Sequence, residues 1–229
     1  MRKLLLAGVA VAGLALAVPA AQAATIGTIP GGAAANNEVI APLTLIEGWY
    51  GANIYLISGG PVQITATLIG VEAGNTNTFF FEGVERFSTT GRTGTLGSPT
   101  GTTAVINDVN PGLLNFAFTT SVNGAQGNVV NGANIEPNNG KGNFFVTFTN
   151  SADYTTIDQV KNNSTPGGGT VAWLFYDDLG AGPDDNHDDL VVRLQITGGS
   201  FTVPEPASMA ILGMGLLGLG FAARRRRQV

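Results

Sequence analysis

Short runs of alternating apolar and polar residues, separated by glycine, proline and asparagine, dominate the middle of this chain. The clearest run is Val62 to Leu68, where the alternation holds for seven residues. Such alternation is typical of a half-buried strand, because successive strand side chains point to opposite faces. No long stretch has helical periodicity. The pattern therefore predicts an all-β protein.

Five more segments have the length and composition of strands. They are Thr78 to Phe81, Leu114 to Thr119, Asn143 to Thr149, Thr170 to Tyr176 and Leu190 to Thr197. Within Asn143 to Thr149, we expect Phe144, Val146 and Phe148 on one face and the residues between them on the other.

Turn signals such as Asn110-Pro111-Gly112 and Pro166-Gly167-Gly168-Gly169 separate these segments. Several short strands joined by such turns predict an antiparallel β-sandwich of jelly-roll-like type. Two Gly-rich stretches, Ser88 to Thr103 and Asn123 to Gly142, are expected to form long surface loops.

The N-terminus has the pattern of a secretory signal peptide. Basic Arg2 and Lys3 precede an apolar run from Leu4 to Val18, and Ala21-Gln22-Ala23 is a small-x-small cleavage site. We expect cleavage after Ala23, with cleavage after Ala20 as the alternative. Residues 1–23 are thus assigned to the signal peptide.

The C-terminus has three ordered parts. Pro204-Glu205-Pro206 interrupts regular structure, Ala207 to Ala223 is apolar, and Arg224, Arg225, Arg226 and Arg227 form a basic cluster. The apolar part has 17 residues and would span about 25 Å as a helix, near the lower limit for crossing a bilayer. We expect a short transmembrane helix with the arginines on the cytoplasmic side.

These three parts resemble the PEP-CTERM sorting signal of Gram-negative bacteria. The resemblance implies export across the inner membrane, a transient membrane stage and processing by an exosortase together with the secretion machinery. It further implies a final place in the cell envelope, on the outer surface or in an extracellular matrix. The expected domains are therefore the signal peptide, a β-sandwich over residues 24–203 and the sorting signal over residues 204–229.

Charge and composition narrow the function of the body. Six of the 11 basic residues lie in the two targeting ends, which leaves five cations against 15 acids and a net charge of −10. Such a body has no basic surface for nucleic acid, and cation binding or solubility outside the cell fits it better. The chain has no cysteine, so neither disulfides nor thiol chemistry is available.

Six carboxylates fall between residues 177 and 189, between two apolar strand segments. Asp184, Asn186 and Asp188 stand at alternate positions, as the oxygen ligands of calcium loops do. An EF-hand is excluded, because Asp189 replaces its sixth-position glycine and Gln195 its twelfth-position glutamate. We expect a calcium site; the alternative is a solvated acidic turn. The predicted ligands are Asp177, Asp178, Asp184, Asn186, Asp188 and Asp189.

The same region resembles an acidic signature near the C-terminus of secreted bacterial β-domains, Asp-x-Asp-[Tyr/Phe]-Asn-Asp-Leu-Val. Residues 184–191 follow it, with Asn186, His187 and Asp188 departing from the pattern. In such domains the acidic loop implies calcium. Leu68 to Asn77 also resembles part of these domains.

Sequence motifs for catalysis are missing. His187 is the sole histidine, and no Gly-x-Ser-x-Gly motif accompanies it. A histidine among loop acids is expected either to be solvated or to support a metal ligand without binding the metal itself. We expect a non-enzymatic, exported envelope or biofilm matrix protein, stabilised by calcium and with exopolysaccharide as a partner. The alternatives are an extracellular polysaccharide hydrolase using two carboxylates, and a surface or ice-binding adhesin.

Overall fold

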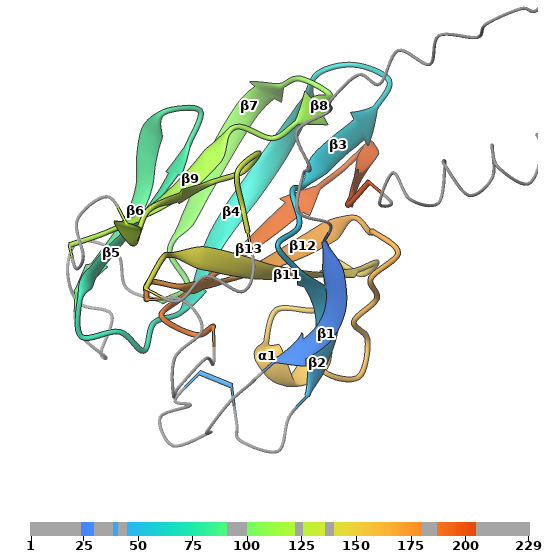
Figure 1. Cartoon of the computed structure of the whole chain (residues 1–229). Helices are drawn as coiled ribbons and strands as arrows, with labels where there is room; N and C mark the ends of the chain where they lie inside the picture. Colours follow the sequence, from blue (N-terminus) through green and yellow to red (C-terminus); the bar gives the residue numbers. More distant parts are fainter. Residues whose placement is uncertain are drawn as a thin grey trace, which may run out of the picture.

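A computed structural model describes residues 24–29, 39–40, 45–90, 100–121, 126–135, 140–179 and 187–204. Its strands form three antiparallel sheets, shown in Figure 1. The seven-stranded sheet has the order β1 (Thr25–Ile29), β2 (Ile46–Tyr50), β11 (Asn143–Thr149), β12 (Val171–Asp177), β13 (Leu190–Ile196), β4 (Val62–Gly70) and β7 (Thr103–Val109).

The two smaller sheets hold four and three strands. The four-stranded sheet has the order β10 (Val129–Val130), β9 (Phe116–Thr120), β5 (Thr76–Phe81) and β6 (Val84–Thr90). The three-stranded sheet has the order β14 (Gly199–Thr202), β3 (Tyr55–Ser58) and β8 (Gly112–Leu113). One short helix, α1 (Ile157–Val160), is present in the described part of the chain.

The all-β, antiparallel, sandwich-like expectation is confirmed. All six predicted segments are strands, with ends shifted by at most two residues. A jelly roll has eight strands in two sheets, so sheets of seven, four and three strands support the sandwich and no specific jelly-roll connectivity.

The main core lies between the seven-stranded and four-stranded sheets. Leu174 and Tyr176 of β12 share it with Phe79 and Phe118 of the four-stranded sheet, and Tyr176 stacks on Phe118 at 4.7 Å between ring centroids. Burial of this much aromatic surface is a large part of the driving force for folding.

A second apolar cluster covers the opposite face of the central strands. It contains Phe145, Trp173 and Phe175 together with Ile29 of β1 and Val160 of α1. Figure 1 shows α1 beside β1 and β2. The predicted alternation in β11 is confirmed, because Phe144, Val146 and Phe148 belong to the main core and Phe145 to this second cluster.

A buried arginine fixes the segment that covers this second face. The Arg193 guanidinium donates to the backbone oxygens of Tyr154 and Ala152 at 2.9 and 2.8 Å, and it lies over the Trp173 ring. Burial lowers the pKa of Arg193.

The surface-loop expectation for Asn123 to Gly142 is wrong in part. This stretch contains β10 and two buried asparagines, Asn131 and Asn134. Each of their amide groups binds backbone atoms of neighbouring segments, with Asn131 bound to Ile54 and Asn134 to Phe144. The side chains thus replace backbone hydrogen bonds that the short strands do not make.

No helix in the described residues is long and apolar enough to cross a membrane. The predicted signal peptide, with Ala21 and Ala23, and the predicted transmembrane helix lie outside those residues.

Candidate metal site and sorting junction

Four acidic residues meet at one end of the β12–β13 pair. Asp177 ends β12 and Asp178 follows it, while Asp188 and Asp189 directly precede β13. The residues just inside them pair across the two strands, so the two acidic pairs face each other where the strands end. We call these four residues the acidic end.

Asp178 connects the two large sheets. Its side chain is buried, and its Oδ2 accepts hydrogen bonds from Asn75 Nδ2 at 3.1 Å and from Thr120 Oγ1 at 3.3 Å. Its backbone N–H donates to Asp189 Oδ2 at 2.7 Å. Thr120 belongs to β9 of the four-stranded sheet and Asn75 directly precedes β5 of the same sheet, so the carboxylate that follows β12 binds two groups of the other layer.

Asp188 is fully buried and tied to two other segments. Its Oδ2 accepts a hydrogen bond from the backbone N–H of Val39 at 3.1 Å, and its carbonyl oxygen accepts one from Glu72 at 3.1 Å. Glu72 and Asn75 both lie in the Leu68 to Asn77 segment. The structure therefore places that segment against the acidic end.

Of the two expectations for His187, the solvated one is wrong. The imidazole is fully buried, its Nε2 lies 2.6 Å from Asn143 Oδ1, and its ring packs edge-on against Tyr50 and Phe145. The backbone at His187 is left-handed, with φ of 56°. This backbone conformation directs the His187 ring into the second apolar cluster. There the ring packs against aromatic side chains and is shielded from water.

The surroundings at the acidic end disfavour the ionised form of Asp189. Burial raises the pKa of Asp189, the charge of Asp178 raises it further, and the hydrogen bond from the Asp178 backbone lowers it. The charges of Asp177 and Asp188 add to the increase. Among the described residues, no lysine or arginine forms an ion pair with Asp178 or Asp189.

The available donors fit a hard cation. The Asp178 carboxylate and the Thr120 hydroxyl supply oxygen atoms there, which calcium prefers as ligands, and Asn75 presents its amide nitrogen to Asp178. In the described part of the chain, no three acidic or histidine side chains are arranged to hold a metal ion by themselves. An ion at the acidic end would therefore need neutral oxygen ligands as well. Asp184 and Asn186 lie outside the described residues.

The opposite end of the β12–β13 pair holds the start of the sorting segment. β14 pairs with β3, and Phe201 exchanges backbone hydrogen bonds with Gly169 at 2.7 and 3.0 Å. Phe201 and Val203 are buried, whereas Pro204 is exposed. The chain thus remains part of the folded body up to the residue before the proline-acid-proline element.

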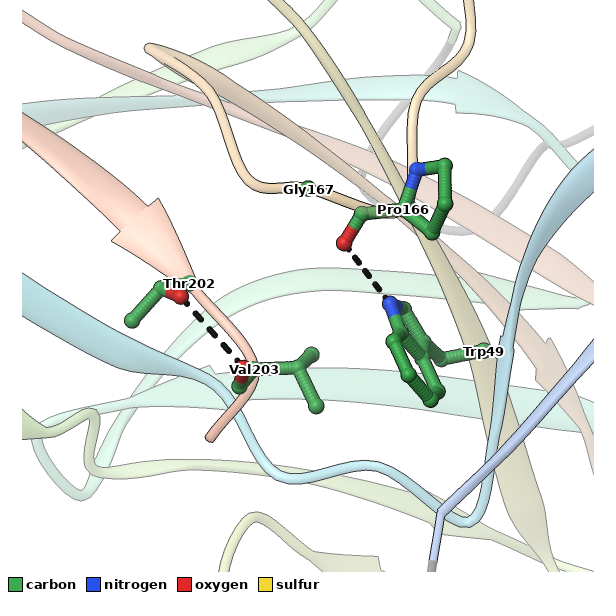
Figure 2. A pocket seen from close by; sticks show the side chains of 5 residues that line it. All are labelled: Trp49, Pro166, Gly167, Thr202 and Val203. Atoms are coloured by element: carbon green, nitrogen blue, oxygen red, sulfur yellow. Dashed lines mark hydrogen bonds between the residues drawn. The ribbon is translucent and has the colours of Figure 1, made fainter. Parts of the chain in front are cut away.

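A small pocket of about 180 Å³ lies at this junction (Figure 2). Its lining residues are Trp49, Pro166, Gly167, Thr202 and Val203. The indole Nε1 of Trp49 donates to the carbonyl oxygen of Pro166 at 2.8 Å, and Figure 2 shows the Val203 side chain directed toward the indole. None of the described residues that line the pocket is acidic. Glu205, Pro206 and Arg224 to Arg227 lie outside the described residues.

Sequence reasoning did not identify the polar partners at either end. Asn75 and Thr120 are 103 and 58 residues away from Asp178 in the sequence. Trp49 is 117 residues away from Pro166. Among these partners, only Asn75 lies in a segment that the sequence analysis had singled out, the resemblance of Leu68 to Asn77.

Comparison with known proteins gives one match. The family of the PEP-CTERM protein-sorting motif matches residues 202–227. No curated protein and no solved structure shows significant similarity to the chain. The match begins at Thr202, the last residue of β14 and a lining residue of the junction pocket. The chain therefore carries the PEP-CTERM sorting motif, which makes it a secreted protein processed by an exosortase at the cell envelope.

Proposed function

We propose that the exported body is a non-enzymatic structural protein of the outer surface or extracellular matrix, stabilised by calcium at the acidic end. The observation that carries the proposal is the position of Asp178. Asp178 directly follows β12 of the seven-stranded sheet, and its buried carboxylate binds Asn75 and Thr120 on the side of the four-stranded sheet. A cation held there would stabilise the contact between the sheets.

Charge supports calcium at this position. Buried carboxylates that repel one another destabilise the folded state unless a proton or a cation offsets them. Calcium accepts irregular sets of six to eight oxygens, and extracellular modules bind it with Kd values of about 10⁻⁴ to 10⁻³ M. A matrix protein would meet calcium in that range.

A structural role also agrees with the position of the residues that catalysis would need. The buried His187 side chain is packed between aromatic rings and cannot serve as a solvent-facing base. Glu47 lies on β2 of the seven-stranded sheet, whereas Glu82 and Glu85 lie at the β5–β6 hairpin. None of these three carboxylates lines the junction pocket, and a glycosidase pair would flank its substrate site.

The partner proposed for the body is an exopolysaccharide of the matrix. The body carries an excess of ten negative charges, so acidic polymers would approach it through shared cations and neutral polymers through hydrogen bonds. A glycan array probed with the processed protein, with and without calcium, tests this part.

Thermal unfolding tests the calcium site. A ligand present at a hundredfold excess over its Kd stabilises the folded state by ~2.7 kcal/mol. For a domain of this size that raises the melting temperature by roughly 5–10 °C. Magnesium should do less, because it requires a tighter octahedral site.

The matched variants are Asp178→Asn and Asp153→Asn. Asp178→Asn keeps the side-chain shape but removes the charge, and should abolish most of the calcium shift. Asp153 is exposed and outside the acidic end, so its variant should keep the full shift. Equal melting temperatures of the unmodified protein in chelator and in millimolar calcium, at fixed ionic strength, would reject the calcium part of the proposal.

Activity assays test the non-enzymatic part. The processed protein should not cleave any member of a polysaccharide panel. Turnover that disappears when a single glutamate is changed to glutamine would instead establish a hydrolase.

A further inference from the structure

Asn77 is a buried polar residue whose side-chain amide has no hydrogen-bond partner in the described part of the chain. Its exposed fraction is 0%, and neither Oδ1 nor Nδ2 has a partner. A buried amide group that makes no hydrogen bond destabilises a folded protein, so such groups usually bind protein, water or an ion. We therefore expect the Asn77 amide to bind a water molecule or an ion.

Other buried asparagines of this protein show the contrast. Asn131 and Asn134 are nearly as buried, and both use their amide oxygen and nitrogen in hydrogen bonds to the backbone. These two residues support irregular strands. Asn77 lies inside the regular strand β5, where the backbone makes its own ladder bonds and needs no such support.

The register of the four-stranded sheet places Asn77 next to the acidic end. Asn77 is the direct cross-strand partner of Thr120 on β9, and such partners have side chains on the same face, with Cβ atoms about 5 Å apart. The Thr120 hydroxyl contacts Asp178 Oδ2 at 3.3 Å. Asn75, two residues before Asn77, contacts the same oxygen at 3.1 Å. Asn77 therefore lies on the same face of the sheet as Thr120, whose hydroxyl contacts Asp178.

Carboxylates alone do not supply enough ligands for a metal ion beside Asp178. The described acids do not form a three-residue metal cluster, so a cation there requires neutral oxygens. An asparagine amide oxygen is a common calcium ligand.

We propose that Asn77 supplies its amide oxygen to the calcium ion held by Asp178. The ion then joins the end of β12 in the seven-stranded sheet to β5 in the four-stranded sheet. This inference rests on the calcium-stabilised function proposed above. It assigns to the site a ligand that the acidic loop does not contain.

Three variants of the full-length protein, exported and processed in its host, test the assignment. Asn77→Asp adds a charged ligand, Asn77→Leu removes the oxygen at similar volume, and Thr89→Val is the control. Thr89 is the cross-strand partner of Asn77 on β6. It lies on the opposite side of β5 from Thr120, and the two threonines are about 10 Å apart. The measurement is the calcium Kd, obtained from melting temperature as a function of calcium concentration.

The two Asn77 variants should change the calcium Kd in opposite directions. We expect Asn77→Asp to lower the Kd by about tenfold and Asn77→Leu to raise it by about tenfold, because ligand charge and number set calcium affinity. Thr89→Val should leave it unchanged. In chelator, Asn77→Asp should melt lower than the unmodified protein, whereas Asn77→Leu should not, because the unsatisfied amide is gone.

The outcomes separate this inference from the proposed function. If calcium does not stabilise even the unmodified protein, the proposed function fails. If calcium stabilises the unmodified protein and both Asn77 variants have the same calcium Kd as that protein, only the Asn77 assignment fails. A buried water molecule then satisfies the amide. If Asn77→Leu does not fold, the direction of the change in Asn77→Asp decides: a lower Kd supports the assignment, and an equal or higher Kd rejects it.

Discussion

The two ends of the β12–β13 pair are built in different ways. β12 has seven residues, so its ends are roughly 20 Å apart. At the acidic end, side chains from distant segments converge on Asp178 through hydrogen bonds to a charged group. At the junction end, backbone atoms of Phe201 and Gly169 bind each other directly, and a tryptophan and a proline close a small pocket.

The difference teaches which end can respond to its surroundings. A group of buried carboxylates changes its energy when a cation or proton arrives. A backbone bridge between uncharged groups does not. We therefore expect the acidic end to respond to ions and the junction end to hold the sorting segment under all conditions.

The largest expected effect is on processing at the junction end. Replacing Pro204, Glu205 and Pro206 by alanine should block removal of residues 207–229, because these residues form the motif and follow directly on the folded body. Intact-mass analysis of envelope-associated protein measures it. Asp178→Asn, at the opposite end, should be processed normally. If the unmodified protein keeps its arginine cluster, the segment is a permanent anchor.

The second prediction concerns the glycine turn at the junction. Gly168 has φ of 92°, and a Cβ there would lie 2.6 Å from the carbonyl oxygen of Phe201. Gly168→Ala should cost about 3–4 kcal/mol of unfolding free energy, by combining left-handed strain with overpacking. Gly198 has φ of 85° and open space around it, so Gly198→Ala should cost only about 1–2 kcal/mol. Denaturant unfolding compares them, and equal costs would mean that the Phe201 bridge yields easily.

The third prediction uses hydrogen exchange to compare the ends directly. Calcium should slow local exchange of the Glu72 and Asp178 amides by up to about a hundredfold, the factor that corresponds to ~2.7 kcal/mol. Both amides bind groups of the acidic end. The Gly169 and Phe201 amides should change much less. Equal protection at both ends would show that calcium stabilises the whole domain without a local effect.

The smallest effect is expected from Trp49→Phe. The substitution removes the hydrogen bond from the indole to Pro166 and should cost about 1 kcal/mol. The calcium shift in melting temperature should remain as in the unmodified protein, because Trp49 lies at the junction end. A reduced calcium shift would show that the two ends are coupled through the central strands.

Part of the fold was predictable because its signals are local. The segment Asn143 to Thr149 is a strand with the predicted ends, and its apolar side chains divide between two clusters by the predicted alternation. The short strands β2, β3 and β8 were not predicted, because two to five residues are too few for alternation to be recognised. The seven-residue strands β6 and β7 were also missed, and the Gly-rich stretch Ser88 to Thr103, which was expected to be a loop, contains the end of β6 and the start of β7.

The candidate site, too, could be predicted only in part from the sequence. The acidic residues and the interval between them are visible in the sequence, but their surroundings are not. His187 is buried because its left-handed backbone turns the ring toward Tyr50 and Phe145. Asn77 looks like an ordinary polar strand residue until the register places it on the same face as Thr120, whose hydroxyl contacts Asp178.

The sequence by itself determined what depends on neighbours along the chain: the central strands, the alternation of their faces, the acidic run between two of them and the sorting motif after the last. The tertiary structure alone decided which distant polar groups meet Asp178 and how the sorting segment leaves the body. Such contacts join residues as far as 149 positions apart, as Val39 and Asp188 are. Their geometry depends on how whole sheets pack, and no local pattern records it.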